Sequence, residues 1–262
     1  MLENLKKLRV LNGNTLKILA AITMFIDHFG LMFYPQNMIF RAIGRIAMPL
    51  FAFMIAEGAR YTRNKTRHFL MLFGLGAICQ IVYFVFSGDT YLNILLTFSM
   101  STLVLYALEA FKNSFWTETK DGKTNLPRIL LTAFLLLLSI LGAYLICKIC
   151  VVDYGFWGCM MPVFANLFDF RSVKKKLGEN APTWMGKLDV LPLRIACFAV
   201  CMALFHFLSK TPLPTAWMFS TVPLLLLYNG ERGKAKMKYF FYVFYPLHLA
   251  LLEGILMLVY YF

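Results

Sequence analysis

The sequence has little charge and few acidic residues. Only 15% of its 262 residues are charged, and its 13 Asp and Glu are half as many as its 26 Lys and Arg. Apolar residues make up 60% of the chain, whereas a soluble domain has about 45–50%. The net charge of +13 does not indicate nucleic-acid binding, because the basic residues punctuate apolar runs instead of gathering in one place. We therefore predict an all-α, polytopic integral membrane bundle with no nucleic-acid partner.

Sequence features of several other protein classes are also missing. The first apolar run has no small-residue processing site at its end, so we expect it to stay as an uncleaved first span. The six cysteines lie nearly all in apolar stretches, and Cys147 and Cys150 alone are too few ligands for zinc. We expect no disulfide and no metal. Residues 229–233 match neither nucleotide-binding fingerprint, and we find no inverted repeat of the transporter type.

Apolar stretches and the breaks between them predict nine membrane spans within a single domain, residues 1–262. A spanning helix needs about 20 mostly apolar residues, and Pro, Gly, Asn and charge runs mark the breaks. Alternate connections hold 20 of the 26 Lys and Arg, which predicts a cytoplasmic N-terminus and an external C-terminus. We expect the Lys-rich segment 172–188 to be a solvated connection. The predicted spans are 15–33, 39–60, 68–87, 91–111, 128–149, 152–169, 190–209, 214–229 and 239–261.

The first two predicted spans keep five ionisable residues that a simple anchor does not need. A charge at membrane depth costs roughly 2.5–3.5 kcal/mol on insertion scales, so such residues are usually functional. At about 1.5 Å of rise per residue, the first pair lies just past the midplane, the second pair descends to that level from the outer face, and the fifth residue lies near the cytoplasmic side. These residues are Asp27 and His28, Arg41 and Arg45, and Glu57.

Four of these residues, all except Arg41, belong to sequence blocks that occur in a fixed order along the chain. The blocks are residues 16–24, 27–28, 44–53, 57–58, 62–64, 154–155, 228–233, 238–242 and 245–249. Together they closely resemble the TraX family of bacterial membrane proteins, over nearly the whole chain. The family's namesake is associated with N-terminal acetylation of conjugative pilin, and the family is similar to transmembrane acyltransferases that use cytoplasmic acyl-CoA. The resemblance implies an acyltransferase of the bacterial cytoplasmic membrane, with acetyl-CoA or another acyl-CoA as co-substrate. Its acceptor would be pilin, a glycan or a surface polymer.

Acyl transfer needs a base for the acceptor's proton and a cation or donors for the developing oxyanion. His28 is the predicted base, because a neutral imidazole is tolerable at that depth and titrates near neutrality. We expect Asp27 to pair with Arg45 or Arg41, favour Arg45, and assign one of these arginines to the reacting carbonyl. His248, on the same face of the last span as Tyr245, is a second acid–base group or a hydrogen-bond donor. The alternative is that the ion pair is structural and His28 is a packing residue.

Donor and acceptor binding have weaker sequence support. Glu57 and Arg63 either contact the pantetheine or adenine end of the donor or stabilise the basic loop that follows Glu57. The family blocks place Asn229 and Arg232 at the donor entrance. The basic loops also attract anionic lipid head groups. The remaining predicted substrate contacts are Arg41, Tyr245, and Asp153 with Tyr154, for which an acidic helix cap is the simpler explanation.

Two other functions fit the same polar residues. A proton-coupled transporter would use them along a translocation path and would alternate access between the two membrane faces. A non-catalytic assembly factor for surface appendages would tolerate replacement of His28. We favour the acyltransferase, which needs only a donor entrance on the inner face.

Overall fold

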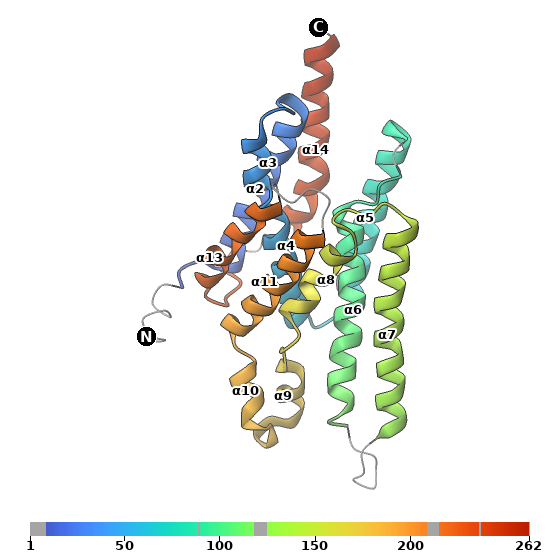
Figure 1. The fold of residues 1–262 in the computed structure, drawn as a ribbon, viewed down its shortest axis with the longest axis vertical. Coiled ribbons are helices and arrows are strands. Elements are labelled where there is room, and N and C mark those ends of the chain that lie inside the picture. Colours follow the sequence, from blue (N-terminus) through green and yellow to red (C-terminus); the bar gives the residue numbers. More distant parts are fainter. Residues whose placement is uncertain (1–8, 89, 118–124, 209–214, 236, 262) are drawn as a thin grey trace. The chain divides into compact units, whose positions relative to one another are not determined.

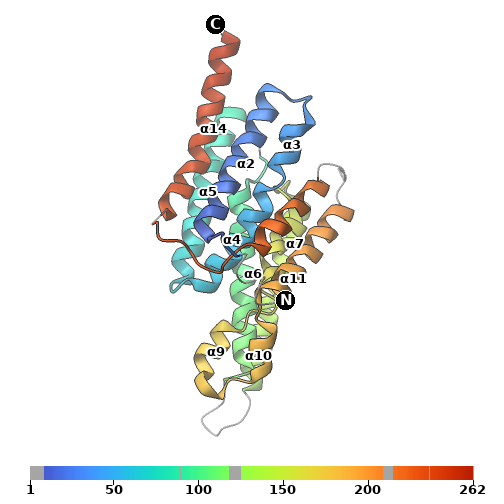
Figure 2. The same cartoon turned by 90° about the vertical axis from the view of Figure 1, so that its left-hand side faces the viewer.

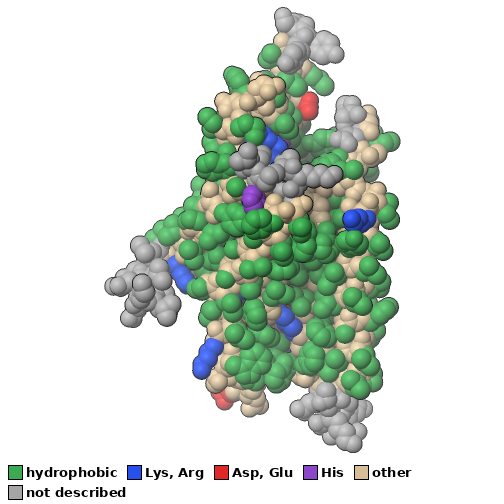
Figure 3. All heavy atoms as spheres, viewed as in Figure 1, with side chains coloured by type: hydrophobic (Ala, Val, Ile, Leu, Met, Phe, Trp, Pro, Cys, Tyr) green, Lys and Arg blue, Asp and Glu red, His purple; other side chains and the backbone are tan. Residues whose placement is uncertain are grey.

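The computed structural model describes residues 9–88, 90–117, 125–208, 215–235 and 237–261. These residues form helices joined by short connections; they contain no strand, and only two isolated β-bridges occur among them. Figure 3 shows a face on which hydrophobic side chains predominate and charged side chains are few, as expected for contact with lipid. The prediction of an all-α, polytopic membrane protein is therefore confirmed.

The chain divides into two compact units, one formed by Met1–Met54 with Met202–Phe262 and the other by Ile55–Cys201. In the first unit α2 packs against both α3 and α14 (Figures 1 and 2). The elements of this unit are α2 (Gly13–Phe33), α3 (Met38–Gly44), the start of α4 (Ala47–Tyr61), the end of α11 (Leu191–Leu208), the 3₁₀ helix η2 (Trp217–Ser220), α13 (Thr221–Leu226) and α14 (Lys238–Tyr261).

In the second unit α6 is the central helix, and it contacts α5, α7, α8 and α9. The unit also contains the end of α4 and most of α11. Its own elements are α5 (Lys65–Ser87), α6 (Ile94–Ser114), α7 (Leu126–Ile149), α8 (Gly155–Ala165), α9 (Arg171–Leu177), η1 (Gly178–Asn180) and α10 (Thr183–Leu188).

Asparagine caps explain where many of these helices begin. At each cap the side-chain oxygen accepts a hydrogen bond from a backbone N–H in the first turn, a group that would otherwise lack a partner. Local sequence therefore sets these starts. The capping residues are Asn12, Asn37, Asn64, Asn93 and Asn125.

Helix lengths do not confirm the predicted count of nine spans. Within the described residues, seven helical segments are long and apolar enough to cross a membrane, while Gly155–Ala165 and Trp217–Leu226 are apolar but shorter. An 11-residue helix such as α8 rises only about 16 Å, whereas the hydrocarbon core is about 30 Å thick. The predicted sixth and eighth spans therefore contain short helices with non-helical flanks. The orientation of the termini stays a prediction.

The predicted second span is interrupted in the middle. It consists of α3 and α4, with a break at Arg45 and Ile46. Pro49 has no N–H to donate to the Arg45 carbonyl, but it is tolerated in the first turn of α4, where helix N–H groups lack partners anyway. The break therefore follows from the position of Pro49.

Residues 172–188, predicted as a solvated connection, are largely exposed but form regular structure. This segment forms α9, η1 and α10, and the side chains of Val173 and Met185 are fully buried. The Lys-rich composition of the segment did not indicate these two apolar residues, which pack it onto the second unit together with polar contacts such as the bond from Asn113 to Ser172.

Candidate functional site

Two histidines from opposite ends of the sequence meet between α2 and α14 in the first unit. His28 Nδ1 lies 2.8 Å from His248 Nε2, and the rings stack with centroids 5.0 Å apart. His248 is almost fully buried, whereas His28 is half-buried. The sequence indicated both residues separately but did not predict their contact. We call this pair the histidine dyad.

Hydrogen bonds assign the tautomers of the dyad. His248 Nδ1 lies 2.8 Å from the Phe244 carbonyl oxygen, which can only accept, so Nδ1 carries the proton. In neutral His248 the other nitrogen, Nε2, is then an acceptor, and His28 Nδ1 donates to it. Neutral His28 therefore has its lone pair on Nε2, which has no hydrogen-bond partner among the described residues. That nitrogen is free to take a proton from a substrate.

An ion pair lies next to the dyad, because Asp27, the residue before His28 in α2, is one of its two partners. Arg41 Nη1 donates to Asp27 Oδ1 at 3.0 Å, with side-chain exposures of 26% and 11%. Arg41 is also close enough for its charge to act on His28, and Arg45 is close enough to act on Asp27. The site therefore holds one carboxylate and two guanidinium groups. Guanidinium groups stabilise a developing negative charge.

Of the two predicted partners of Asp27, the structure shows the ion pair with Arg41, whereas the prediction favoured Arg45. Gly44 lies directly against the Asp27 side chain, and a Cβ at this position would overlap it. Arg41 is three residues before Gly44 and so lies on the same face of α3, the face that meets Asp27. Arg45 follows Gly44 as the C-cap of α3.

Aromatic rings enclose His248 on α14. The Phe244 ring stacks on it with centroids 4.9 Å apart, and Tyr245 approaches it edge-on at 5.9 Å. Tyr245 is buried, so the structure places this predicted substrate contact next to the dyad. The apolar surroundings exclude water from the His248 side of the site, which strengthens electrostatic interactions there.

Asn229 and Arg232, predicted at the donor entrance, belong to a segment that is hydrogen-bonded to the start of α2. Asn229 N donates to the Leu11 carbonyl at 2.8 Å, and Asn14 N donates to the Arg232 carbonyl at 3.0 Å. The Asn229 side chain accepts from Glu231 N, closing a local turn. We call residues 11–14 together with 227–235 the clasp. Both predicted residues thus lie in the same unit as the dyad.

Glu57 lies in the second unit, where it pairs with a residue that the sequence analysis missed. Arg194 Nη1 on α11 lies 2.6 Å from Glu57 Oε1, and both side chains are buried. Arg194 also donates to the Ala165 carbonyl and to the side-chain oxygen of Asn166, at 3.0 and 2.7 Å. Glu57 thus has a structural partner in this unit, and its predicted contact with a donor stays a prediction.

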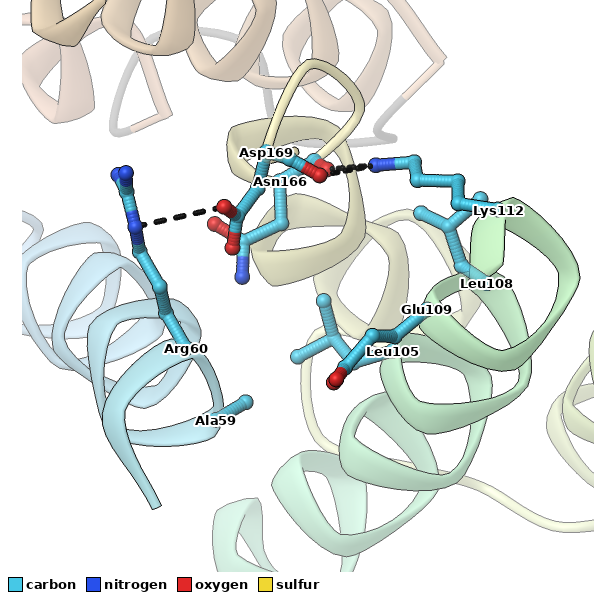
Figure 4. Close-up of a pocket in the computed structure, with 8 residues that line it drawn as sticks. All are labelled: Ala59, Arg60, Leu105, Leu108, Glu109, Lys112, Asn166 and Asp169. Atoms are coloured by element: carbon cyan, nitrogen blue, oxygen red, sulfur yellow. Dashed lines mark hydrogen bonds and ion pairs between the residues drawn. The ribbon is translucent and has the colours of Figure 1, made fainter. Parts of the chain in front are cut away.

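A polar hollow lies beside this network (Figure 4). Lys112 Nζ donates to the backbone carbonyls of Asn166 and Asp169, so its ammonium group stabilises the C-terminal end of α8. Arg60 bridges Asp169 and the fully buried carboxylate of Asp189. The hollow is lined by Ala59, Arg60, Leu105, Leu108, Glu109, Lys112, Asn166 and Asp169.

The remaining predicted site residues also lie in the second unit. Asp153 accepts a hydrogen bond from the Tyr91 hydroxyl at 2.7 Å. Tyr154 is the N-cap of α8, with a left-handed φ of 58°, so Asp153 is not the cap. Arg63 is exposed in the short connection between α4 and α5. Their predicted roles in binding substrate or donor stay predictions.

The residues that the sequence analysis missed could have been found by the criterion that identified His28, a polar residue inside an apolar span. Arg194 and Asn166 are polar residues inside the predicted spans 190–209 and 152–169. Applying the cost of polar groups at membrane depth to every span would have found them. Within the described residues, no group of three His, Cys, Asp or Glu side chains is arranged to hold a metal ion.

Comparisons with known proteins agree with this arrangement of sequence blocks. The family model described as TraX protein matches residues 12–256, and so extends over both units. A probable fimbrial assembly protein, FimC of serogroup H1 from Dichelobacter nodosus, is 27% identical over 248 residues, which are 90% of this chain and 92% of that protein.

Two further relatives match over shorter stretches. Protein TraX of Escherichia coli is 32% identical over 121 residues, 45% of each chain. An uncharacterised protein of Rickettsia prowazekii is 38% identical over 108 residues, 41% of this chain and 40% of that protein. Each of these two matches therefore covers less than half of the relative. No solved structure matches the chain.

Proposed function

Because the chain belongs to the TraX family, we propose that it is a membrane-embedded acyltransferase. It would move an acetyl or other acyl group from cytoplasmic acyl-CoA to an amine or hydroxyl group of a surface acceptor, in the bacterial cytoplasmic membrane. The observation that carries the proposal is the hydrogen-bond chain from Phe244 through His248 to His28, which leaves His28 Nε2 as a base.

In the proposed reaction His28 Nε2 takes the proton of the acceptor's N–H or O–H group as that atom attacks the thioester carbonyl. The carbonyl oxygen becomes an oxyanion, and Arg41, or Arg45 beside it, stabilises the negative charge. The carbon–sulfur bond then breaks, and His28 returns its proton to the sulfur. The products are the acylated acceptor and free coenzyme A. His248 holds the His28 ring in the required tautomer and is therefore a positioning residue.

Basic side chains in the second unit support a cytoplasmic donor. Arg60, Lys65, Lys112 and Lys174 gather near the hollow or pair with acidic residues beside it. We propose that these side chains, with the exposed Arg63, attract the phosphate groups of acyl-CoA. Anionic lipid head groups would compete for the same charges.

The relative that matches over nearly its whole length points to a class of acceptor. It is described as a probable fimbrial assembly protein. A fimbrial or pilus subunit with a free N-terminal amine is therefore the acceptor we propose to test first, followed by a glycan or another surface polymer.

The test follows coenzyme A release and label transfer from radiolabelled acetyl-CoA, using detergent-purified protein and a native membrane extract. We expect His28→Ala to lower kcat by about 10²–10⁴-fold, the usual contribution of a general base. We expect His248→Ala to lower kcat by a smaller factor. His206→Ala is the matched control, because His206 bonds to Thr215 and not to the dyad.

Three outcomes contradict the proposal. Coenzyme A release that is equal in wild type and His28→Ala removes His28 as the base. No turnover with any extract argues against an enzyme, and proton uptake coupled to solute movement in proteoliposomes would then support the transporter. Unimpaired appendage assembly with His28→Ala would support the assembly factor.

A further inference from the structure

The clasp joins the beginnings of the two helices that carry the dyad. Gly13 N donates to the Glu231 carbonyl at 2.7 Å, next to the bond from Asn14 N to Arg232. The Asn14 side chain adds a bond to the Ala235 carbonyl at 2.7 Å. Asn14 is buried, so these bonds are shielded from water. They attach the first turn of α2 to the segment that leads into α14.

Both helices run in the same direction from the clasp (Figures 1 and 2). Lys17 of α2 lies over the Phe241 ring of α14 at 5.8 Å, and further along the same pair of helices His28 meets His248. Parallel neighbours far apart in sequence have no short connection to set their axial alignment. The clasp is the hydrogen-bonded link that does so near their starts.

The dyad is sensitive to that alignment. A slip of one residue moves a helix by about 1.5 Å along its axis. A hydrogen bond of this type tolerates only about 0.4 Å beyond its usual length before it weakens. The 2.8 Å contact between His28 and His248 therefore requires that the starts of α2 and α14 be held in one register.

Gly233 shows how closely the two parts of the clasp approach. Its φ is +91°, and a Cβ at this position would overlap the side chain of Asn12. Asn12 in turn accepts hydrogen bonds from Asn14 N and Thr15 N, both at 3.0 Å, as the N-cap of α2. A side chain at position 233 would push on the residue that caps α2.

We propose that the clasp is the register device of the histidine dyad, and that Asn14 and Gly233 are positioning residues for it. The kinetic part of this inference rests on the proposed acyl transfer, whereas the structural part does not. Asn229 and the glycine-containing turn after it then serve to hold residues 227–235 against the start of α2.

The variants Asn14→Asp and Gly233→Ala test this role, each with a matched control. Asn93→Asp removes an equivalent buried bond, from Asn93 Nδ2 to the Gly76 carbonyl at 2.8 Å, in the other unit. Gly230→Ala places alanine at a similar φ of +82° in the same segment, where a Cβ meets nothing within 4 Å. Each control carries the same chemical change without disturbing the contact between the clasp and α2.

The first readout is the ¹⁵N spectrum of the histidine rings in bilayers, which distinguishes the two tautomers. The chain has four histidines, so His68→Gln and His206→Gln are enough to isolate the dyad. We expect wild type and both controls to show the Nδ1–H tautomer of His28 bonded to His248. Asn14→Asp and Gly233→Ala should lose this signature.

The second readout is the kinetics of acyl transfer. We expect Asn14→Asp and Gly233→Ala to lower kcat by roughly ten- to a hundredfold, the effect of misplacing a catalytic group by about 1 Å, with a smaller change in KM for acyl-CoA. An unchanged ring spectrum in both variants overturns the inference, and so does equal loss of the signature in the controls. If wild type transfers no acyl group, the proposed function fails, and the ring spectra alone still decide the role of the clasp.

Discussion

Gly44 allows α3 to approach Asp27 because it has no Cβ, and this contact selects Arg41 as the partner of the carboxylate. The pairing of Asp27 with Arg41 therefore depends on the absence of a side chain at Gly44. The sequence analysis predicted that both arginines lie near the depth of Asp27, yet depth does not tell which face of a short helix meets α2.

Gly44→Ala should therefore be destabilising. The new Cβ would overlap the Asp27 side chain, and such overpacking typically costs about 1–3 kcal/mol. Gly142→Ala on α7 is the control, because a Cβ there meets nothing within 4 Å; alanine should leave the stability unchanged or raise it by up to about 1 kcal/mol. The measurement is the free energy of unfolding in mixed micelles. Equal effects of the two substitutions would show that the contact with Asp27 does not constrain position 44.

The histidines illustrate what sequence can find at this scale. His28 and His248 were identified because a polar group inside an apolar span needs a reason. Their contact was not predictable from the sequence, since it depends on the rotation and axial position of two helices whose sequences are more than 200 residues apart.

At the level of elements, Arg194 ties three helices of the second unit together. From α11 its guanidinium reaches Glu57 on α4 and both Ala165 and Asn166 at the end of α8. Asn166 extends the link by donating to the Ala56 carbonyl at 2.9 Å. Short helix α8 is thus held at its end by polar bonds as well as by apolar packing.

Arg194→Met should be strongly destabilising, because it leaves the Glu57 carboxylate buried without its ion-pair partner. Loss of one partner of a buried pair costs about 3–5 kcal/mol. We expect Glu57→Gln in the same chain to recover a large part of this loss, since a neutral amide is cheaper to bury than a carboxylate. Unfolding free energies of the two single variants and the double variant provide the check. No recovery in the double variant would show that the packing of Arg194, and not its charge, matters.

Helix starts are encoded locally, because capping is an interaction between an asparagine and its next three residues. The predicted spans nevertheless begin one to three residues away from the starts of the long helices. The helical content of residues 172–188 was not predictable in the same way. Val173 and Met185 are buried only because the second unit provides a surface for them, and composition alone indicated a solvated loop.

For the whole molecule, the direction of the helices bears on the number of membrane crossings. In the first unit α2 and α14 run parallel from the clasp, which predicts an odd number of crossings. In the second unit, the segment from Val152 to Asn166 runs beside α6 along its length. It is joined to Leu92 near one end of α6 and to Lys112 near the other. Although its helix is short, this segment therefore extends between contacts near the two ends of α6, a helix long enough to cross the membrane.

We predict that residues 151 and 175 lie on opposite sides of the membrane. The measurement is labelling of Val151→Cys and Lys175→Cys with a membrane-impermeant thiol reagent, in a chain whose six native cysteines are replaced. Val151→Cys should react in intact cells, and Lys175→Cys only after the membrane is opened, because the basic segment around Lys175 favours the cytoplasmic side. Residue 37, in the predicted outer connection, serves as the external control. Labelling of both positions in intact cells would make α8 a re-entrant helix and reduce the number of crossings.

The sequence by itself determined the membrane class, the helical fold, the ends of the seven long apolar segments to within three residues, and the choice of His28, His248 and Asp27 as polar residues of interest. Each of these depends on local properties: apolar composition, capping residues, and the cost of burying a charge. The tertiary structure decided which residues become partners, namely His28 with His248, Asp27 with Arg41, and Glu57 with Arg194. Which residues become partners depends on helix rotation and register to within a few tenths of an ångström. Contacts between residues far apart in the sequence set both, as in the clasp, whose two segments lie near opposite ends of the chain.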